Sequence, residues 1–235
     1  MRFRPSLWLT VSAGIAFAIL CSLGVWQLQR LEWKEGLIAQ IDERMGGEPV
    51  PLPQTLDDPD AWRFRPVTVT GSFVHDAESH RTGRPERGAI GYRIFTPLRR
   101  ADGGGIVMVE RGWVPEPLKD PAARPGDPPA GEVTITGIVR LPDPRNTFTP
   151  DDDPAANIWF ASDPVAMAAA YGLTVPPWYV VDRDSAADWP RAGPPQLSLK
   201  NDHLGYAMTW FSLAAVLLVI WLLMGFRRGR TETPQ

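Results

Sequence analysis

Residues 204–226, LGYAMTWFSLAAVLLVIWLLMGF, form a stretch without a single charged side chain. A second such stretch, residues 5–29, reads PSLWLTVSAGIAFAILCSLGVWQLQ. A helix needs about 20 apolar residues, at about 1.5 Å rise each, to cross the hydrocarbon core of a bilayer. Both stretches meet this requirement and nothing between them does. The sequence therefore predicts a membrane protein with transmembrane helices at residues 6–28 and 203–226.

A cleaved secretory signal peptide is the alternative interpretation of the first stretch. The apolar region of such a peptide has about 7–15 residues and is followed by a small-residue cleavage site. Here the apolar run continues past Cys21 to Leu28, and the small residues at 12–14 come too early to form that site. We therefore expect an uncleaved anchor.

Basic residues flank both predicted spans on the sides that face the chain ends: Arg2, Arg4, Arg227, Arg228 and Arg230. Positively charged flanks stay in the cytoplasm. Both termini, including a tail at residues 227–235, are thus expected there. The middle domain is expected on the opposite side of the membrane.

The basic residues are mostly arginine, since Lys34, Lys119 and Lys200 are the only lysines, and this is typical of a GC-rich bacterium. An Arg-rich and Ser-rich amphipathic leader, which would mark a mitochondrial precursor, does not precede the first span. The sequence therefore predicts a bacterial inner-membrane protein whose middle domain is periplasmic.

Charge and cysteine content exclude several partners and sites for the middle domain. The chain has a formal net charge of -3, and every acidic residue except Glu232 lies between the two spans. This acidic segment is a poor match for nucleic acid. The only cysteine, Cys21, lies in the first span, so a thiolate metal site or a Cys-x-x-Cys-His haem attachment in the middle domain is excluded.

Residues 29–45 continue the first helix in the predicted organisation, as a juxtamembrane helix that ends at Gly46 and Gly47. Pro49, Pro51 and Pro53 then predict a stiff extended linker. Residues 46–200 are expected to form one β-rich α+β domain outside the cytoplasm.

Strands of this domain are predicted from alternating or continuous apolar runs at residues 67–73, 91–98, 106–109, 133–139 and 178–181. Residues 101–105, ADGGG, predict a hairpin turn. A short helix is expected after the N-cap residue Asp163, ending at Gly172. The similarity between residues 67–71 and 133–137 is interpreted as ordinary strand composition rather than duplication.

Two histidines, His75 and His80, follow the first predicted strand of the domain among charged neighbours. A metal site from His75, Asp76 and His80 is one interpretation, and solvated loop residues are the favoured one. The run of aspartates at 151–153 is interpreted as an acidic turn rather than a cation site. Motifs such as HExxH, GxSxG or a phosphate-binding loop are absent, so we do not expect an enzyme.

The third histidine, His203, opens the second span and shares one helix face with Tyr206 and Trp210, at spacings of three and four. The positive end of a helix dipole disfavours imidazolium, and neutral imidazole is the form that binds metals. These aromatic rings are suited to a flat ligand such as a porphyrin. An aromatic belt at the membrane interface is the alternative that the residues alone favour.

Five blocks of sequence resemble the surfeit locus protein 1 family, the assembly factors of cytochrome c oxidase. They read GVWQLQRLEWK at 24–34, GYRIFTPL at 91–98, RGWVP at 111–115, NIW at 157–159 and NDHLGYAMTWF at 201–211. The resemblance covers nearly the whole chain. One departure is visible, since Asp202 stands where the family pattern often has asparagine.

The resemblance implies a role in maturing the catalytic subunit of the oxidase, with haem a supplied by other machinery. It implies His203 as the haem-contacting histidine, with Tyr206 and Trp210 in the same block. On this basis we expect His203 to be the axial ligand of haem iron, with Tyr206, Trp210 and Trp26 against the ring. Arg30 or Lys34 would pair with the haem propionates.

Two other functions remain open at this point. A scaffold without cofactor would dock on the oxidase subunit through Arg111, Gly112 and Trp113. A periplasmic enzyme would use His75 or His80, but a paired nucleophile is missing from the sequence.

Overall fold

The computed structural model describes residue 3 and residues 5–82, 88–127, 129–184, 188–193 and 201–231, with the backbone alone for 228–231. The chain forms two compact units. One unit consists of Met1–Gln40 and Ser198–Gln235, and the other of Ile41–Leu197. Of the basic flanks, Arg2 and Arg4 lie outside the described residues, as do the side chains of Arg228 and Arg230.

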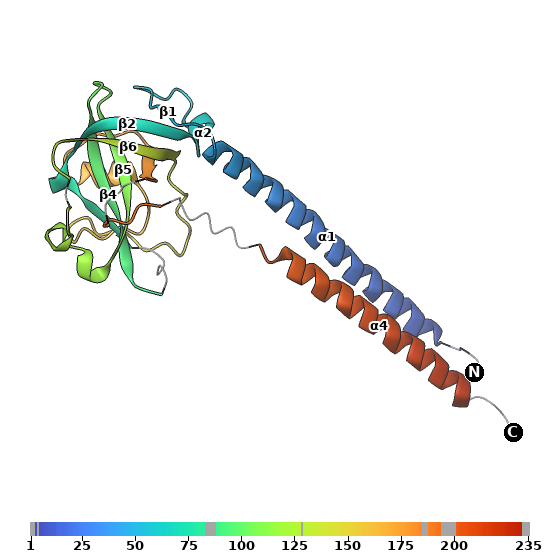
Figure 1. Cartoon of the computed structure of the whole chain (residues 1–235). Coiled ribbons are helices and arrows are strands. Elements are labelled where there is room, and N and C mark those ends of the chain that lie inside the picture. Colours follow the sequence, from blue (N-terminus) through green and yellow to red (C-terminus); the bar gives the residue numbers. More distant parts are fainter. Residues whose placement is uncertain are drawn as a thin grey trace. The chain divides into compact units, whose positions relative to one another are not determined.

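Two long helices, α1 (Leu7–Met45) and α4 (His203–Thr231), make up most of the first unit. Both are long and apolar enough to span a bilayer, and their apolar stretches are largely exposed rather than buried in protein. A mostly buried core helix of a soluble protein would not expose this surface. The prediction of two candidate transmembrane helices flanking a β-rich domain is confirmed (Figure 1).

Helix α1 is continuous, so residues 29–45 are not a separate element. Gly46 follows its last residue, and its N–H donates to the carbonyl of Asp42. Arg183 donates to the last helical carbonyl, that of Met45, over 2.8 Å. A cation at this place satisfies a free carbonyl and complements the helix dipole.

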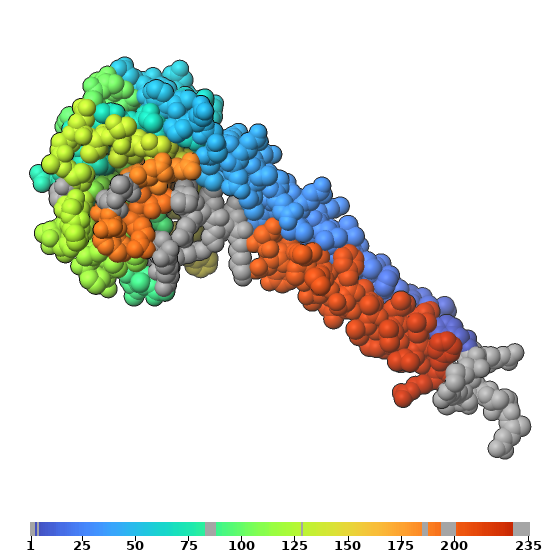
Figure 2. All heavy atoms as spheres, in the orientation of Figure 1, coloured from blue at the N-terminus to red at the C-terminus, as the bar shows by residue number. Residues whose placement is uncertain are grey.

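The two helices of the first unit lie side by side (Figure 2). Gly24 of α1 and Ala207 and Ala214 of α4 are buried. Small residues let helices approach closely in a bilayer, where packing rather than the hydrophobic effect holds them together. Nearer the chain ends, Trp221 Nε1 donates to Thr10 Oγ1 over 3.2 Å.

The second unit is a closed β-barrel. The sheet order is β1-β2-β6-β7-β5-β4-β3, and an additional β2–β4 pairing closes five of the strands on themselves. The β1–β2 and β5–β7 pairs are parallel and the other pairs antiparallel. The strands are β1 (Val50–Pro51), β2 (Pro66–Phe73), β3 (Ser79–Thr82), β4 (Gly91–Arg100), β5 (Ile106–Pro115), β6 (Glu132–Arg140) and β7 (Tyr179–Asp182).

Within the described residues, the domain also has two short α-helices and three 3-10 turns. They are α2 (Pro59–Trp62), η1 (His75–Ala77), η2 (Glu116–Leu118), η3 (Pro121–Ala123) and α3 (Pro164–Ala169). Asp163 caps α3 by accepting from the N–H of Ala166 over 3.0 Å, as its sequence predicted.

Strand β5 is buried on both faces, which explains its continuous apolar sequence. Val107 and Val109 belong to one apolar cluster with Val67, Val69 and other strand residues. Met108, between them, belongs to a second cluster with α3 and Trp159. Alternate residues of a strand point to opposite faces, so β5 separates the two clusters.

The five predicted strands and the hairpin turn at 101–105 are present. The two similar strands pair with each other, with Val67 opposite Gly137 and Gly71 opposite Val133. Strands β1 and β3 were not predicted.

The predicted linker at Pro49–Pro53 is wrong, because these residues belong to the barrel domain. Val50 and Pro51 form β1, and Leu52 is buried in the first cluster. Arg100 holds this segment by donating to the carbonyls of Leu52 over 2.6 Å and Pro53 over 2.7 Å. Proline is compatible with an edge strand, where its missing N–H is not needed.

Candidate functional site

The first candidate site lies where α4 begins. His203 Nδ1 is 2.8 Å from Gln27 Oε1, across the two helices. Both side chains are half-buried. We call Trp26, Gln27, His203, Tyr206 and Trp210 the helix junction.

The contact between Gln27 and His203 defines which ring nitrogen carries a proton. An amide oxygen can only accept, so His203 Nδ1–H is the donor. In a neutral imidazole the other nitrogen, Nε2, then keeps its lone pair. That lone pair is the one that binds a metal. The junction therefore presents a histidine in a form able to ligate iron.

Gly24, one turn before Gln27, sets how closely the helices approach. A Cβ atom at this glycine would be 2.7 Å from Cζ of the Phe211 ring. Real Cβ atoms do not come this close, so the ring occupies the space that a side chain at 24 would need. This contact fixes the helix register beside the Gln27–His203 pair.

Aromatic side chains of the junction differ in exposure. Trp26 and Tyr206 are 54% and 56% exposed, whereas Trp210 is half-buried. The shared face of His203, Tyr206 and Trp210 thus has an inner and an outer part. Arg30 lies with its guanidinium carbon 3.9 Å from the centre of the Trp33 ring, on the exposed side of α1. The haem-contacting roles of Trp26, Arg30, Tyr206 and Trp210 stay predictions.

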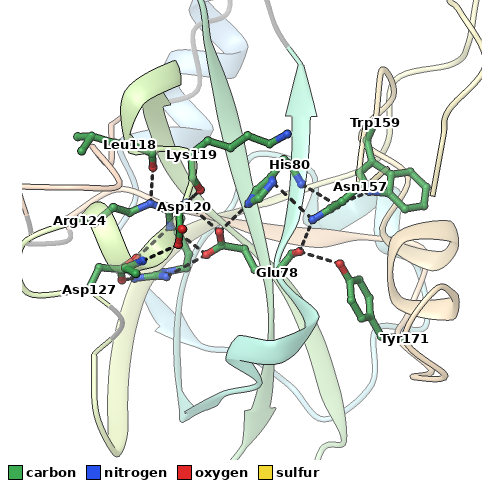
Figure 3. A network of polar contacts seen from close by, with 12 residues as sticks. Glu78, His80, Leu118, Lys119, Asp120, Arg124, Asp127, Asn157, Trp159 and Tyr171 are labelled. Atoms are coloured by element: carbon green, nitrogen blue, oxygen red, sulfur yellow. Dashed lines mark hydrogen bonds and ion pairs between the residues drawn. The ribbon is translucent and has the colours of Figure 1, made fainter. Parts of the chain in front are cut away.

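The second candidate site is a network of buried charges in the barrel domain, at β3 and the loop that follows β5. Arg124 donates to both carboxylate oxygens of Glu78, over 2.8 and 3.0 Å, and to Asp127 over 3.0 Å (Figure 3). Its remaining N–H groups donate to the carbonyls of Leu118 and Lys119. The Arg124 side chain is fully buried. Asp127 also forms an ion pair with a second arginine, Arg111.

His80, Asn157 and Trp159 extend this network on the side away from Arg124. His80 Nε2 lies 2.8 Å from Glu78 Oε1, and its Nδ1 is 3.4 Å from the Asn157 amide nitrogen. Since the amide nitrogen can only donate, Nδ1 is an acceptor and Nε2–H is the donor to Glu78. Asn157 Oδ1 accepts from Trp159 Nε1 and from the backbone N–H of His80.

Charges in this network balance. Glu78 and Asp127 are matched by Arg111 and Arg124, and the two ring nitrogens of His80 contact Glu78 and Asn157. Burial raises the pKa of Glu78, but hydrogen bonds from His80 and Arg124 and the Arg124 charge outweigh it, so this pKa is below its ordinary value. Buried charges without such partners would cost several kcal/mol.

The interpretation of His80 as a solvated loop residue is wrong. His80 is buried on β3, and the bridge between Arg81 and Trp159 places the 157–159 segment beside it. His75 lies in η1 with Nε2 3.0 Å from the carbonyl of Pro129. Among the described residues, no three His, Cys, Asp or Glu side chains gather as a metal site, so His75, Asp76 and His80 do not form one.

Aspartates 151–153 hold a turn, in agreement with that prediction. Asp152 accepts from the N–H of Phe160 over 2.6 Å and pairs with Arg145 over 2.5 Å. Asp153 accepts from the N–H of Ala156.

The predicted docking residues Arg111, Gly112 and Trp113 are buried in the domain. A bulge lies here, because Phe95 pairs with Glu110 and Ile94 with Gly112, which leaves Arg111 without an opposite residue. Gly112 has a φ of +128°, and Trp113 exchanges backbone hydrogen bonds with Arg191. Because these residues are buried, they expose little surface to a partner. Docking on the oxidase subunit through them stays a prediction.

Comparison with known proteins gives the family of this chain. A model of the SURF1 family matches residues 14–215, which include both Gln27 and His203. The chain belongs to the SURF1 family.

Relatives within the SURF1 family match most of this chain. Surfeit locus protein 1 of Xenopus tropicalis is 36% identical over 216 residues, covering 85% of this chain and 70% of that protein. A SURF1-like protein of Drosophila melanogaster is 37% identical over 219 residues, covering 85% and 71%. Surfeit locus protein 1 of Homo sapiens is 34% identical over 229 residues, covering 90% and 74%.

Two features of this SURF1 family member were missed by sequence reasoning. Gln27 lies in a quoted block, but only the α4 contact indicates its role. Glu78 and Arg124 carry no local signal, since they are 46 positions apart and meet only when the loop after β5 folds back. Two of the blocks that resemble the family, 111–115 and 157–159, do contain residues of this network: Arg111, Asn157 and Trp159.

Proposed function

We propose that this protein acts in the assembly of cytochrome c oxidase by binding haem a at the helix junction and passing it to the catalytic subunit. His203 would hold the haem iron. Membership of the SURF1 family supports the role in assembly, which the family resemblance implied. The tautomer of His203 supports the ligand assignment, because Nδ1–H is held by Gln27 and Nε2 retains its lone pair.

The residues present fit a porphyrin in chemical type. Trp26 on α1 and Tyr206 on α4 offer exposed aromatic surface, and Arg30 offers a cation for a propionate. When bound, the haem would be cargo for the oxidase, whose electron and oxygen chemistry it carries. The chain's own contribution is to bind, orient and protect it, without catalysing a reaction.

The proposed location is a bacterial inner membrane, with both termini cytoplasmic and the barrel domain periplasmic. The arginines at the chain ends support this orientation under the positive-inside rule. The proposed partners are the oxidase catalytic subunit and the proteins that supply haem a.

The absorbance spectrum of the protein purified from cells that make haem a tests this function. We expect a haem a spectrum for the wild type and its loss in His203→Ala. His75→Ala is the matched control, since His75 lies outside the helix junction and should leave the haem content unchanged. Wild-type haem content in His203→Ala would reject His203 as the ligand.

A scaffold without cofactor makes the opposite prediction. In that case the protein would co-purify with the oxidase catalytic subunit from cells unable to make haem a, and as efficiently as from cells that make it. The two strains therefore separate the functions in one pull-down experiment.

A further inference from the structure

Gln27 and His203 are 176 positions apart and form a side-chain hydrogen bond between the two helices. Glutamine at an interhelical position in a bilayer is commonly a simple contact between helices. What distinguishes this pair is its direction. The oxygen of Gln27 faces Nδ1, so this contact does not involve the other ring nitrogen of His203, Nε2.

We propose that Gln27 is a positioning residue that holds His203 in the Nδ1–H tautomer and orients its ring for an iron ligand. This inference rests on the proposed function and deepens it. Histidines that bind metals usually donate their second N–H to a carbonyl or carboxylate, which fixes the tautomer and raises the basicity of the ligating nitrogen. Gln27 supplies such a carbonyl from the neighbouring helix.

The surrounding packing makes this orientation specific. Gly24 lies one turn before Gln27 on the same face of α1, and the Phe211 ring packs against it. A Cβ atom at Gly24 would lie only 2.7 Å from this ring. Ala207, one turn after His203, is also buried. A slide of one helix along the other would therefore bring the Phe211 ring into larger side chains. The register that seats Phe211 is also the register that brings Gln27 Oε1 to His203 Nδ1.

Alternative roles for Gln27 make different predictions. A residue that only joins the helices would be replaceable by an apolar side chain of similar size, because α1 and α4 also touch at Gly24 and Thr10. A positioning residue would instead need an acceptor at this place. Glutamate and leucine are both close in size to glutamine and differ in whether they accept a hydrogen bond, so Gln27→Glu and Gln27→Leu separate the two roles.

The experiment uses the full chain in detergent and compares wild type with Gln27→Glu, Gln27→Leu and the control Gln29→Leu. Gln29 is exposed on the same helix. The first readout needs no haem: ¹⁵N NMR of histidine-labelled apoprotein reports which nitrogen of His203 is protonated. We expect the Nδ1–H form in wild type, Gln27→Glu and Gln29→Leu, and a mixture of tautomers in Gln27→Leu.

The second readout is haem a binding and the iron–histidine stretching frequency in the ferrous form. Loss of such a supporting hydrogen bond weakens metal affinity by about 10–100-fold. We expect that loss, with a lower stretching frequency, in Gln27→Leu. In Gln27→Glu we expect retained affinity and a higher frequency, because a carboxylate is the stronger acceptor. Thermal unfolding of each apoprotein shows whether the helix pair itself has changed.

The outcomes separate this inference from the proposed function. Wild-type tautomer and haem affinity in Gln27→Leu, alongside loss of haem in His203→Ala, overturn the positioning role and leave the haem site standing. Equal losses in Gln27→Leu and Gln27→Glu, with equally lowered melting temperatures, show a packing role and also overturn it. Unchanged haem content in His203→Ala rejects the ligand assignment itself.

Discussion

Gly24 of α1 and Phe211 of α4 fit together so closely that a Cβ atom at Gly24 would lie 2.7 Å from the ring. The Phe211 ring therefore packs directly on the backbone of α1, where Gly24 has no side chain. This one contact lies beside the Gln27–His203 pair, and the first prediction follows from it.

Gly24→Ala should separate the helices at the junction. Overpacking of this kind typically costs about 1–3 kcal/mol. We expect the His203 tautomer to become mixed in the ¹⁵N spectrum and haem content to fall. Gly14→Ala is the matched control, because nothing lies within 4 Å of a Cβ at Gly14. A second change, Phe211→Leu, should restore the junction of Gly24→Ala, and failure to do so would argue against the steric explanation.

Glu78→Gln should destabilise the barrel domain by about 3 kcal/mol, because it leaves Arg124 buried with one fewer charged partner. Denaturant unfolding of the full chain, followed by tryptophan fluorescence, measures this. Glu116→Gln removes an exposed carboxylate from η2 and should stay within about 0.5 kcal/mol of wild type. Similar values for both variants would contradict the importance of the buried network.

The same residue predicts a pH dependence. The pKa of Glu78 in the folded protein lies below its ordinary value of 4.5. Its stabilising contribution is therefore complete above pH 4.5 and is lost as the pH falls through the folded-state pKa. We expect the free energy of unfolding to fall more steeply below pH 4.5 in wild type than in Glu78→Gln. Parallel curves for the two proteins would show that Glu78 is not responsible.

Substitutions of Asn157 should lower the stability of the domain in two ways, by removing its side-chain hydrogen bonds and by straining its backbone. It has a φ of +52°, and its side chain bonds to Glu78, His80 and Trp159. Asn157→Ala loses the bonds and strains the backbone, so we expect a loss of about 3 kcal/mol. Asn157→Gly loses only the bonds and should be about 1 kcal/mol more stable than Asn157→Ala. Equal stabilities would show that backbone strain contributes nothing at this position.

Gly112→Ala should be among the most damaging small substitutions in the domain. Its Cβ would overlap the carbonyl oxygen of Arg191, and its φ of +128° disfavours any side chain. We expect at least about 3 kcal/mol of destabilisation by thermal or denaturant unfolding. Gly131→Ala has a positive φ but open space around its Cβ, so it should cost about 1 kcal/mol. The difference between the two isolates the steric overlap.

Local composition was enough to predict part of this fold. The charge-free stretches at 5–29 and 204–226 define their helices, because a bilayer span depends on length and polarity alone. The hairpin between β4 and β5 follows from Gly103, Gly104 and Gly105 between two apolar runs. Strand β3 was missed since Ser79–Thr82 has no apolar residue, and β1 was missed because its prolines suggested a linker.

The candidate sites depended on contacts distant in sequence. His203 was predicted from its position in α4, but the nitrogen that it presents depends on Gln27 of α1. His80 has polar neighbours in sequence, but it is buried, with Glu78 and the segment around Asn157 beside it. Patterns within about ten residues cannot reveal such pairings.

The separation of Gln27 and His203 has a consequence for biogenesis. Chains are made from the N-terminus, so Gln27 leaves the ribosome 176 residues before its partner. The barrel domain must be synthesised before α4 can pack beside α1, and in the proposed topology it must also be translocated first. A truncated or stalled polypeptide has the amide without the imidazole and cannot display the ligating nitrogen. Under the proposed function, competence to capture a haem is thereby postponed until α4 has been made, and unfinished chains are kept from sequestering it.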